Sequence, residues 1–200
     1  MKAEELIKNI SKLLNLSGAE FVLCGSWCMH YYQKILPFKY SLRTMDIDFV
    51  FALKTRNLKK VDLGSFLKQE GFSRLAVSDL EVLYVSESLR IDFLIQQKKP
   101  REKAMFIEKL GIYAVPLYFI DYLIPEKIEI EGIPLPLPER FYFHKLIVSQ
   151  KRQNPSKALK DLEQAKAIRE VLNQKKLEEL KKNLHNKWKK LIEKAEKILF

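Results

Sequence analysis

Three prolines at alternate positions, Pro134, Pro136 and Pro138, divide this 200-residue chain into two parts of different character. Before them, short apolar segments alternate with helical patterns, whereas every segment after them has helical spacing. Because proline fixes φ and has no backbone donor, we expect a stiff joint at this point. The sequence therefore predicts an α/β domain over 1–137, followed by a helical lobe over 138–200.

The first part predicts a small mixed β-sheet flanked by helices. Apolar spacing indicates helices over 2–15, 27–35 and 61–70, a short helical pattern over 117–123, and strands over 20–24, 47–53, 73–77, 81–85 and 89–96. The last three of these strands are typical of an antiparallel meander, and Glu131-Gly132 predicts a hairpin between 127–130 and 133–135. In the second part we expect helices over 141–150, 156–172 and 175–199.

Composition excludes several classes of protein. Hydrophobic residues make up 47% of the chain, which is enough for a sizeable core, and no apolar run reaches the length of a membrane span. The first residues have acids beside lysines and predict an amphipathic helix, not a signal peptide. Cys24 and Cys28 are the only cysteines, which excludes a disulfide framework and a four-cysteine zinc site. We therefore expect a cytoplasmic protein with no membrane partner.

The positive charge is concentrated near the end of the chain. The net charge is +11, and residues 141–200 hold 16 Lys and Arg against 7 Asp and Glu. Such a lobe could attract a polyanion, either a nucleic acid or a nucleoside triphosphate. The alternative is a solvated helical surface. Fourteen of the sixteen bases are lysine, which argues against specific recognition of phosphates or bases.

Gly25 and Ser26 stand between a predicted strand and a predicted helix. Glycine lets a backbone approach a ligand closely, and the start of a helix offers free N–H groups to an anion. The alternative is a purely conformational role in the turn.

Asp46 and Asp48 enter the strand predicted at 47–53. Residues two apart on a strand point to one face, about 6.5–7 Å apart, so two carboxylates there repel each other unless a cation lies between them. Oxygen ligands of this kind suit Mg²⁺ or Mn²⁺. The alternative is that Asp46 is a cap and Asp48 a solvated acid.

Asp92 lies within the strand predicted at 89–96. It shares a face with Arg90 and Leu94, and because Leu94 is apolar we expect Asp92 to be partly buried. A partly buried acid needs a partner or a metal. If this strand lies beside 47–53, three carboxylates converge in a way that supports two-metal chemistry at phosphorus.

These motifs resemble the polymerase-β-type nucleotidyltransferase superfamily, in particular its toxin-like, abortive-infection-type members. The resemblance covers about residues 18–172 and rests on Gly25-Ser26, on LRTMDIDF at 42–49, on Arg90-Ile91-Asp92-Phe93, on PERF at 138–141, on HKLIV at 144–148, on Arg152 and on KDL at 160–162 with Gln164-Ala165. The long segment between Ser26 and Asp46 fits the toxin-like branch better than the antibiotic-modifying branch.

The resemblance implies a role for each of these residues. Gly25 and Ser26 would hold the triphosphate, Asp46 and Asp48 would bind Mg²⁺, and Asp92 would complete a second metal site and act on the attacking hydroxyl. Lys145 matches a lysine that reaches the nucleotide phosphates. Arg152 and Asp161 match polar positions that face the cleft, although an Arg–Asp pair joining two helices explains them equally well.

The sequence therefore predicts a metal-dependent nucleotidyltransferase that moves an NMP from an NTP to a hydroxyl of tRNA or of a protein and releases pyrophosphate. Its cofactor would be Mg²⁺ or Mn²⁺. One alternative is a non-catalytic, nucleic-acid-binding module that keeps the fold, although all three carboxylates are present. Another is a toxin held silent by a partner antitoxin.

Overall fold

The computed structural model describes residues 2–52 and 58–199. Its contacts divide the chain into two units, one made of Met1–Cys28 and Arg43–Pro136 and the other of Met29–Leu42 and Leu137–Phe200. The two-part plan drawn from the sequence placed 29–42 with the first part. The contacts instead group residues 29–42 with the C-terminal helices. Tyr32 packs edge-on against Phe141 at 5.5 Å, and Gln164 Nε2 donates to Tyr40 Oη at 3.2 Å.

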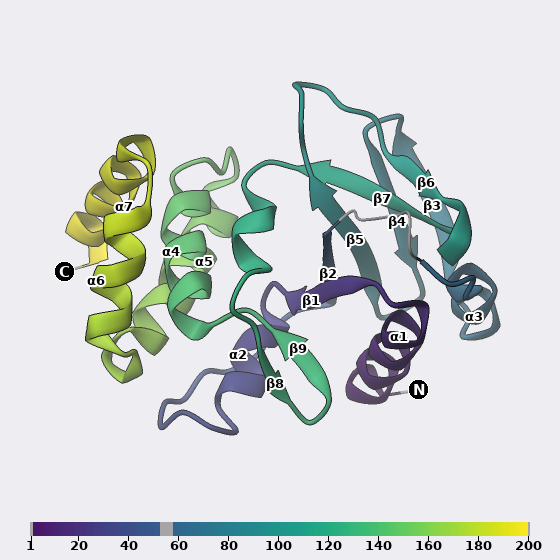
Figure 1. Ribbon diagram of the computed structural model, residues 1–200, viewed down its shortest axis with the longest axis horizontal. Coiled ribbons are helices and arrows are strands. Elements are labelled where there is room, and N and C mark those ends of the chain that lie inside the picture. Colours follow the sequence, from purple (N-terminus) through teal and green to yellow (C-terminus); the bar gives the residue numbers. More distant parts are fainter. Residues whose placement is uncertain (1, 53–57, 200) are drawn as a thin grey trace. The chain divides into compact units, whose positions relative to one another are not determined.

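The first unit is built on a mixed β-sheet, shown in Figure 1. Its strands are β1 (Glu20–Cys24), β2 (Asp46–Ala52), β3 (Ser73–Ser78), β4 (Glu81–Val85), β5 (Arg90–Gln96), β6 (Met105–Ile107) and β7 (Ile112–Leu117). The main order is β1-β2-β5-β4-β3, and β7 pairs with both β5 and β6. A separate hairpin consists of β8 (Ile128–Ile130) and β9 (Ile133–Leu135). The predicted mixed α/β fold class is confirmed.

The two faces of this sheet bury different side chains. One face carries an aromatic group, in which Phe49 stacks on Phe93 at 5.9 Å and Phe21 lies 6.2 Å from Phe49. The other face carries smaller side chains, among them Val22 and Val50, which pack against the 3₁₀ helix η3 (Ile120–Leu123). By strand alternation this second face is also the face of the predicted site residues on β2 and β5.

The helices begin and end close to the predicted positions. In the first unit they are α1 (Ala3–Ser17), α3 (Leu63–Gln69) and the 3₁₀ helix η2 (Glu108–Leu110). α2 (Trp27–Tyr32) crosses from the first unit into the second. The second unit contains α4 (Pro138–Ser149), α5 (Pro155–Ile168), η4 (Arg169–Val171), α6 (Gln174–Asn183) and α7 (Asn186–Leu199).

Three segments differ from the predictions. The single helix expected over 175–199 is wrong, because Leu184 is extended (ψ 146°) and His185 Nδ1 accepts from the N–H of Lys187 at the start of α7. The helical pattern at 117–123 shortens to η3, since Leu117 ends β7. β6 and β7 were not anticipated, and β7 contains Pro116, which sequence rules disfavour in a strand.

Among residues 2–52 and 58–199, none of the helices has both the length and the apolar character that crossing a membrane requires.

Candidate active site

Asp48 and Asp92 are brought together by the pairing of β2 with β5. These strands run parallel, and their register sets Asp48 opposite Asp92 and Asp46 opposite Arg90. The expected condition, that the strand of Asp92 lies beside the strand of the Asp pair, is confirmed. Alternation along parallel strands places all four residues on one sheet face.

Burial differs among the three aspartates. Asp92 is buried, with 8% of its surface exposed, whereas Asp46 and Asp48 are half-buried. The alternative that Asp46 serves as a cap receives no support from its contacts, because its own N–H donates to Thr44 Oγ1 at 3.2 Å and its carboxylate faces Arg90. The acids therefore lie at a boundary between the core and solvent, where charges interact more strongly than in water.

Arg90, which the sequence analysis named only as part of a motif and as a neighbour of Asp92, is the basic partner of these acids. Its Nη2 lies 2.8 Å from Asp92 Oδ2 and 3.7 Å from Glu81 Oε1, and its Nε lies 3.9 Å from Asp46 Oδ1. The signal was present in the sequence, because Arg90 stands two residues before Asp92 and therefore on the same strand face. The guanidinium of Arg90 therefore lies within 4 Å of the carboxylates of Asp46, Glu81 and Asp92.

Burial and this ion pair shift the pKa of Asp92 in opposite directions. Burial raises the pKa of Asp92, and the nearby charges of Asp46 and Glu81 raise it further, while the hydrogen bond from Arg90 partly offsets them. For Arg90, burial alone would lower the pKa, but the bond and charge of Asp92 outweigh it, so the pKa of Arg90 is raised. Asp92 is therefore a better proton acceptor than an exposed aspartate.

Gly25 is required by the position of Asp48. Its φ is +70°, in the left-handed region, and a Cβ atom built on it would collide with Asp48 Oδ2. In the register of β1 with β2, the neighbouring residue Cys24 lies opposite Asp48. The turn at Gly25-Ser26 therefore touches the carboxylate group directly. Ser26 is buried, with 7% exposure, in this turn.

The carboxylates do not form a ready metal centre in this geometry. Within residues 2–52 and 58–199, no three or more His, Cys, Asp or Glu side chains are grouped so that they could hold a metal ion. The guanidinium of Arg90 lies among these carboxylates and contacts Asp46 and Asp92.

Lys145, Arg152 and Asp161 form a second cluster, within the helical unit. Lys145 Nζ contacts Asp161 Oδ1 at 2.7 Å, and Arg152 Nε contacts Asp161 Oδ2 at 2.9 Å. Lys145 and Asp161 are buried, while the Arg152 side chain is 41% exposed. Burial alone would raise the pKa of Asp161, but its two basic partners outweigh burial and lower it. The Arg–Asp pair that the sequence offered as an alternative is present, although Arg152 lies in the loop after α4, and it is Lys145 of α4 that joins this helix to Asp161 of α5.

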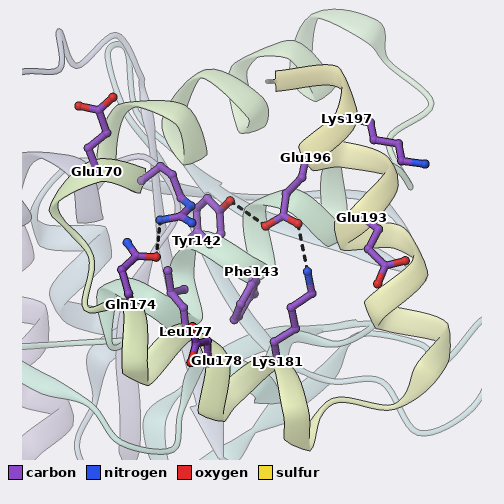
Figure 2. Close-up of a pocket in the computed structure, with 11 residues that line it drawn as sticks. Tyr142, Phe143, Glu170, Gln174, Leu177, Glu178, Lys181, Glu193, Glu196 and Lys197 are labelled. Carbon is purple, nitrogen blue, oxygen red and sulfur yellow. Dashed lines mark hydrogen bonds and ion pairs between the residues drawn. The ribbon is translucent and has the colours of Figure 1, made fainter.

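A pocket of about 770 Å³ also lies within the helical unit, between α4, η4, α6 and α7. Figure 2 shows Glu196 between Tyr142 and Lys181, to which it is joined at 3.2 and 3.1 Å. Burial, helped by the charge of Glu196, raises the pKa of Tyr142. The predicted site residues are absent from the described lining of this pocket.

Comparison with known proteins identifies one family. The family model described as "Nucleotidyltransferase" matches residues 2–189. Among curated proteins, none matches the chain.

Several solved structures are similar to the chain at low identity. The solution structure of the antibiotic-resistance factor ANT(2'')-Ia has a TM-score of 0.41 and 15% identity over 82% of this chain and 84% of that one. The crystal structure of ANT(2'')-Ia in complex with adenylyl-2''-tobramycin has a TM-score of 0.45 and 14% identity over 88% and 94%. An antigenic nucleotidyltransferase-like protein from Paracoccidioides brasiliensis has a TM-score of 0.46 and 13% identity over 82% and 74%.

Proposed function

This chain belongs to the nucleotidyltransferase family, and from that premise we propose that it transfers a nucleoside monophosphate from an NTP to a hydroxyl acceptor. The acceptor oxygen forms a bond to the α-phosphorus, the bond from that phosphorus to the bridging oxygen breaks, and pyrophosphate leaves. The observation that carries the proposal is the register of β2 and β5, which aligns Asp48 with Asp92 and leaves Asp46 on the same face.

The three carboxylates have the donor chemistry that a divalent cation such as Mg²⁺ or Mn²⁺ requires, although in the described residues they are not grouped around a metal position. Asp46, Asp48 and Asp92 offer carboxylate oxygens, which hard cations prefer, from one face of two adjacent strands. The absence of a side chain at Gly25 leaves room for the Asp48 carboxylate. When bound, such a cation would neutralise phosphate charge and stabilise the charge that develops during transfer.

The roles proposed for the other residues come from the resemblance of their motifs to those of nucleotidyltransferases. Asp92, whose pKa is raised by burial, accepts the proton of the attacking hydroxyl. Gly25 and Ser26 hold the triphosphate at a turn that touches Asp48. The resemblance assigns Lys145 to the phosphates, and within the helical unit Asp161 holds its ammonium group through a 2.7 Å ion pair.

The acceptor is proposed from charge. Residues 141–200 carry 16 Lys and Arg against 7 Asp and Glu, which favours tRNA as the acceptor and leaves a protein hydroxyl as the second candidate. The resemblance to toxin-like relatives adds the proposal of an antitoxin partner. Co-purification of the tagged chain from cells that express its neighbouring genes tests that partner.

The central experiment is a labelling reaction. The purified chain is incubated with each NTP, labelled at the α- or the γ-phosphate, with Mg²⁺ or Mn²⁺, and with either tRNA or a protein lysate. We expect label from α- but not γ-labelled NTP, with release of pyrophosphate, and no label with Asp48→Asn. Label in RNA identifies tRNA as the acceptor, and label in protein identifies a protein hydroxyl. Absence of transfer under every condition would favour the non-catalytic binding module.

A further inference from the structure

Arg90 is placed to compete for the carboxylates that the proposed function assigns to a divalent cation. Its guanidinium reaches Asp92 at 2.8 Å, within hydrogen-bonding distance, and approaches Asp46 at 3.9 Å. The Arg90 side chain is 35% exposed and that of Asp92 is 11% exposed, so their bond is shielded from most of the solvent. Ionised carboxylates on adjacent strand positions repel each other, and the guanidinium of Arg90 offsets part of that repulsion.

The contacts of Arg90 are unequal, and this indicates how it can move. Nη2 makes its short contact to Asp92, while the same nitrogen lies 3.7 Å from Glu81 Oε1 on β4. Nε faces Asp46 at a distance too long for a hydrogen bond. A small shift of the guanidinium would therefore exchange Asp92 for Glu81 without leaving the arginine unpaired.

We propose that Arg90 is the internal counter-ion of this carboxylate face, and that a divalent cation binds by releasing Arg90 from Asp92 toward Glu81. This inference rests on the proposed function, since it concerns the same three aspartates. It makes Arg90 a positioning residue. In the metal-free protein Arg90 holds Asp92 in place and reduces the repulsion among the acids. When the metal binds, Arg90 gives up its contact with Asp92.

The test is binding of Mn²⁺ alone, followed by the rise in melting temperature and by calorimetric titration, without nucleotide. We expect Arg90→Gln to lower the melting temperature of the metal-free protein, because the acids lose their counter-ion. We also expect it to tighten Mn²⁺ binding about tenfold, the equivalent of one charge-assisted hydrogen bond that no longer has to be broken. Arg74→Gln is the matched control. Arg74 lies in the same unit on β3, its contact is with the ring of Tyr113, and its loss should leave Mn²⁺ binding unchanged.

A second variant should act in the opposite direction. Glu81→Gln leaves Arg90 and Asp92 intact but removes the carboxylate that receives the released guanidinium, so Mn²⁺ should bind more weakly than to the wild type. This variant keeps the test valid even if Arg90→Gln proves too unstable to titrate.

The outcomes separate this inference from the proposed function. If the wild type binds Mn²⁺ and Arg90→Gln binds it equally or less tightly, the counter-ion inference is overturned and the metal-dependent function stands. The inference is likewise overturned if Glu81→Gln binds Mn²⁺ as tightly as the wild type. If neither the wild type nor Arg90→Gln binds Mn²⁺, the metal site of the proposed function fails, and the inference fails with it.

Discussion

Asp48 and Asp92 lie directly opposite each other on neighbouring parallel strands, and Asp92 is the more buried of the two. Opposite positions on paired strands bring side chains about 5 Å apart, and like charges there are destabilising. The carboxylate face therefore carries repulsion in the metal-free protein, which Arg90 reduces through its contacts to Asp92 and Asp46.

Replacing Asp48 by Asn removes one of these like charges at almost no steric cost. We expect the metal-free variant to be at least as stable as the wild type. At a Mn²⁺ concentration of 100 times Kd, the wild type should gain about 2.7 kcal/mol and the variant should lose most of that gain. Thermal melting with and without Mn²⁺ measures both effects. If millimolar Mn²⁺ leaves the melting temperature of the wild type unchanged, the proposed metal dependence is contradicted.

Gly25 and Gly71 form a matched pair for testing the turn. Both have positive φ, +70° and +82°, but only at Gly25 would a Cβ meet Asp48, while nothing lies within 4 Å of one at Gly71. Gly71→Ala should therefore cost only the backbone strain, about 1 kcal/mol. Gly25→Ala should cost more and should abolish transferase activity. Equal losses of stability in urea unfolding, with activity kept in both variants, would show that the turn has no role at the site.

Lys145 is expected to matter for stability as well as for the nucleotide. Lys145→Met leaves Asp161 buried with Arg152 as its remaining basic partner, and breaking such a buried pair costs about 3 kcal/mol. The double variant Lys145→Met/Asp161→Asn should recover part of this loss, because the buried charge is gone. A cost below about 0.5 kcal/mol in urea unfolding would show that the buried Lys145–Asp161 pair contributes little to stability.

The role of Lys145 in nucleotide binding needs a separate measurement. If Lys145 contacts the triphosphate, titration with a non-hydrolysable NTP should show weaker binding to the Lys145→Met variant, while the Mn²⁺-induced rise in melting temperature is kept. Unchanged NTP affinity would leave Lys145 with the structural role alone.

His144 predicts a loss of stability in mild acid. Burial, with a contribution from the charge of Lys145, lowers the pKa of His144 from 6.5 to about 3. Between these values the unfolded chain binds a proton that the folded chain does not, so the stability contributed by neutral His144 is present above pH 6.5 and is lost as the pH falls. The slope is up to about 1.4 kcal/mol per pH unit. Urea unfolding from pH 7 to pH 5 should show this slope in the wild type and in His185→Gln, an exposed control, but not in His144→Gln.

The excess of lysine in residues 141–200 predicts salt-dependent RNA binding. Lys181 is engaged by Glu196 at 3.1 Å, so the test uses Lys182, Lys189 and Lys190, near the break between α6 and α7. If they contact phosphates, replacing all three by Gln should reduce the slope of log affinity against log salt by about 2 to 3. The pair Lys98→Gln/Lys99→Gln, exposed residues of the first unit, is the control. No binding of tRNA by the wild type at 50 mM salt would favour a protein acceptor.

Much of the local structure could be predicted from the sequence. The strand at Glu20–Cys24, the meander of β3, β4 and β5, and the hairpin at Glu131-Gly132 follow from apolar periodicity and turn residues, which act over a few neighbours. The start of α5 could also be predicted, because Asn154 is a residue type that caps helices. In the structure its side chain accepts from the N–H groups of Ser156 and Lys157. Local signals failed where the break at Leu184 interrupts a continuous helical pattern and where Pro116 lies inside a strand.

The sequence by itself determined the candidate residues of the site: two aspartates at i and i+2 on a strand, a third on a later strand, and a Gly-Ser turn. Only the tertiary structure decided how they meet. The parallel register that sets Asp48 opposite Asp92, the approach of Arg90 to Asp46, and the packing of 29–42 with the C-terminal helices all join residues far apart in the chain. Periodicity specifies which face a side chain occupies, but the choice of partner strand and the burial of charge depend on contacts that no short window contains.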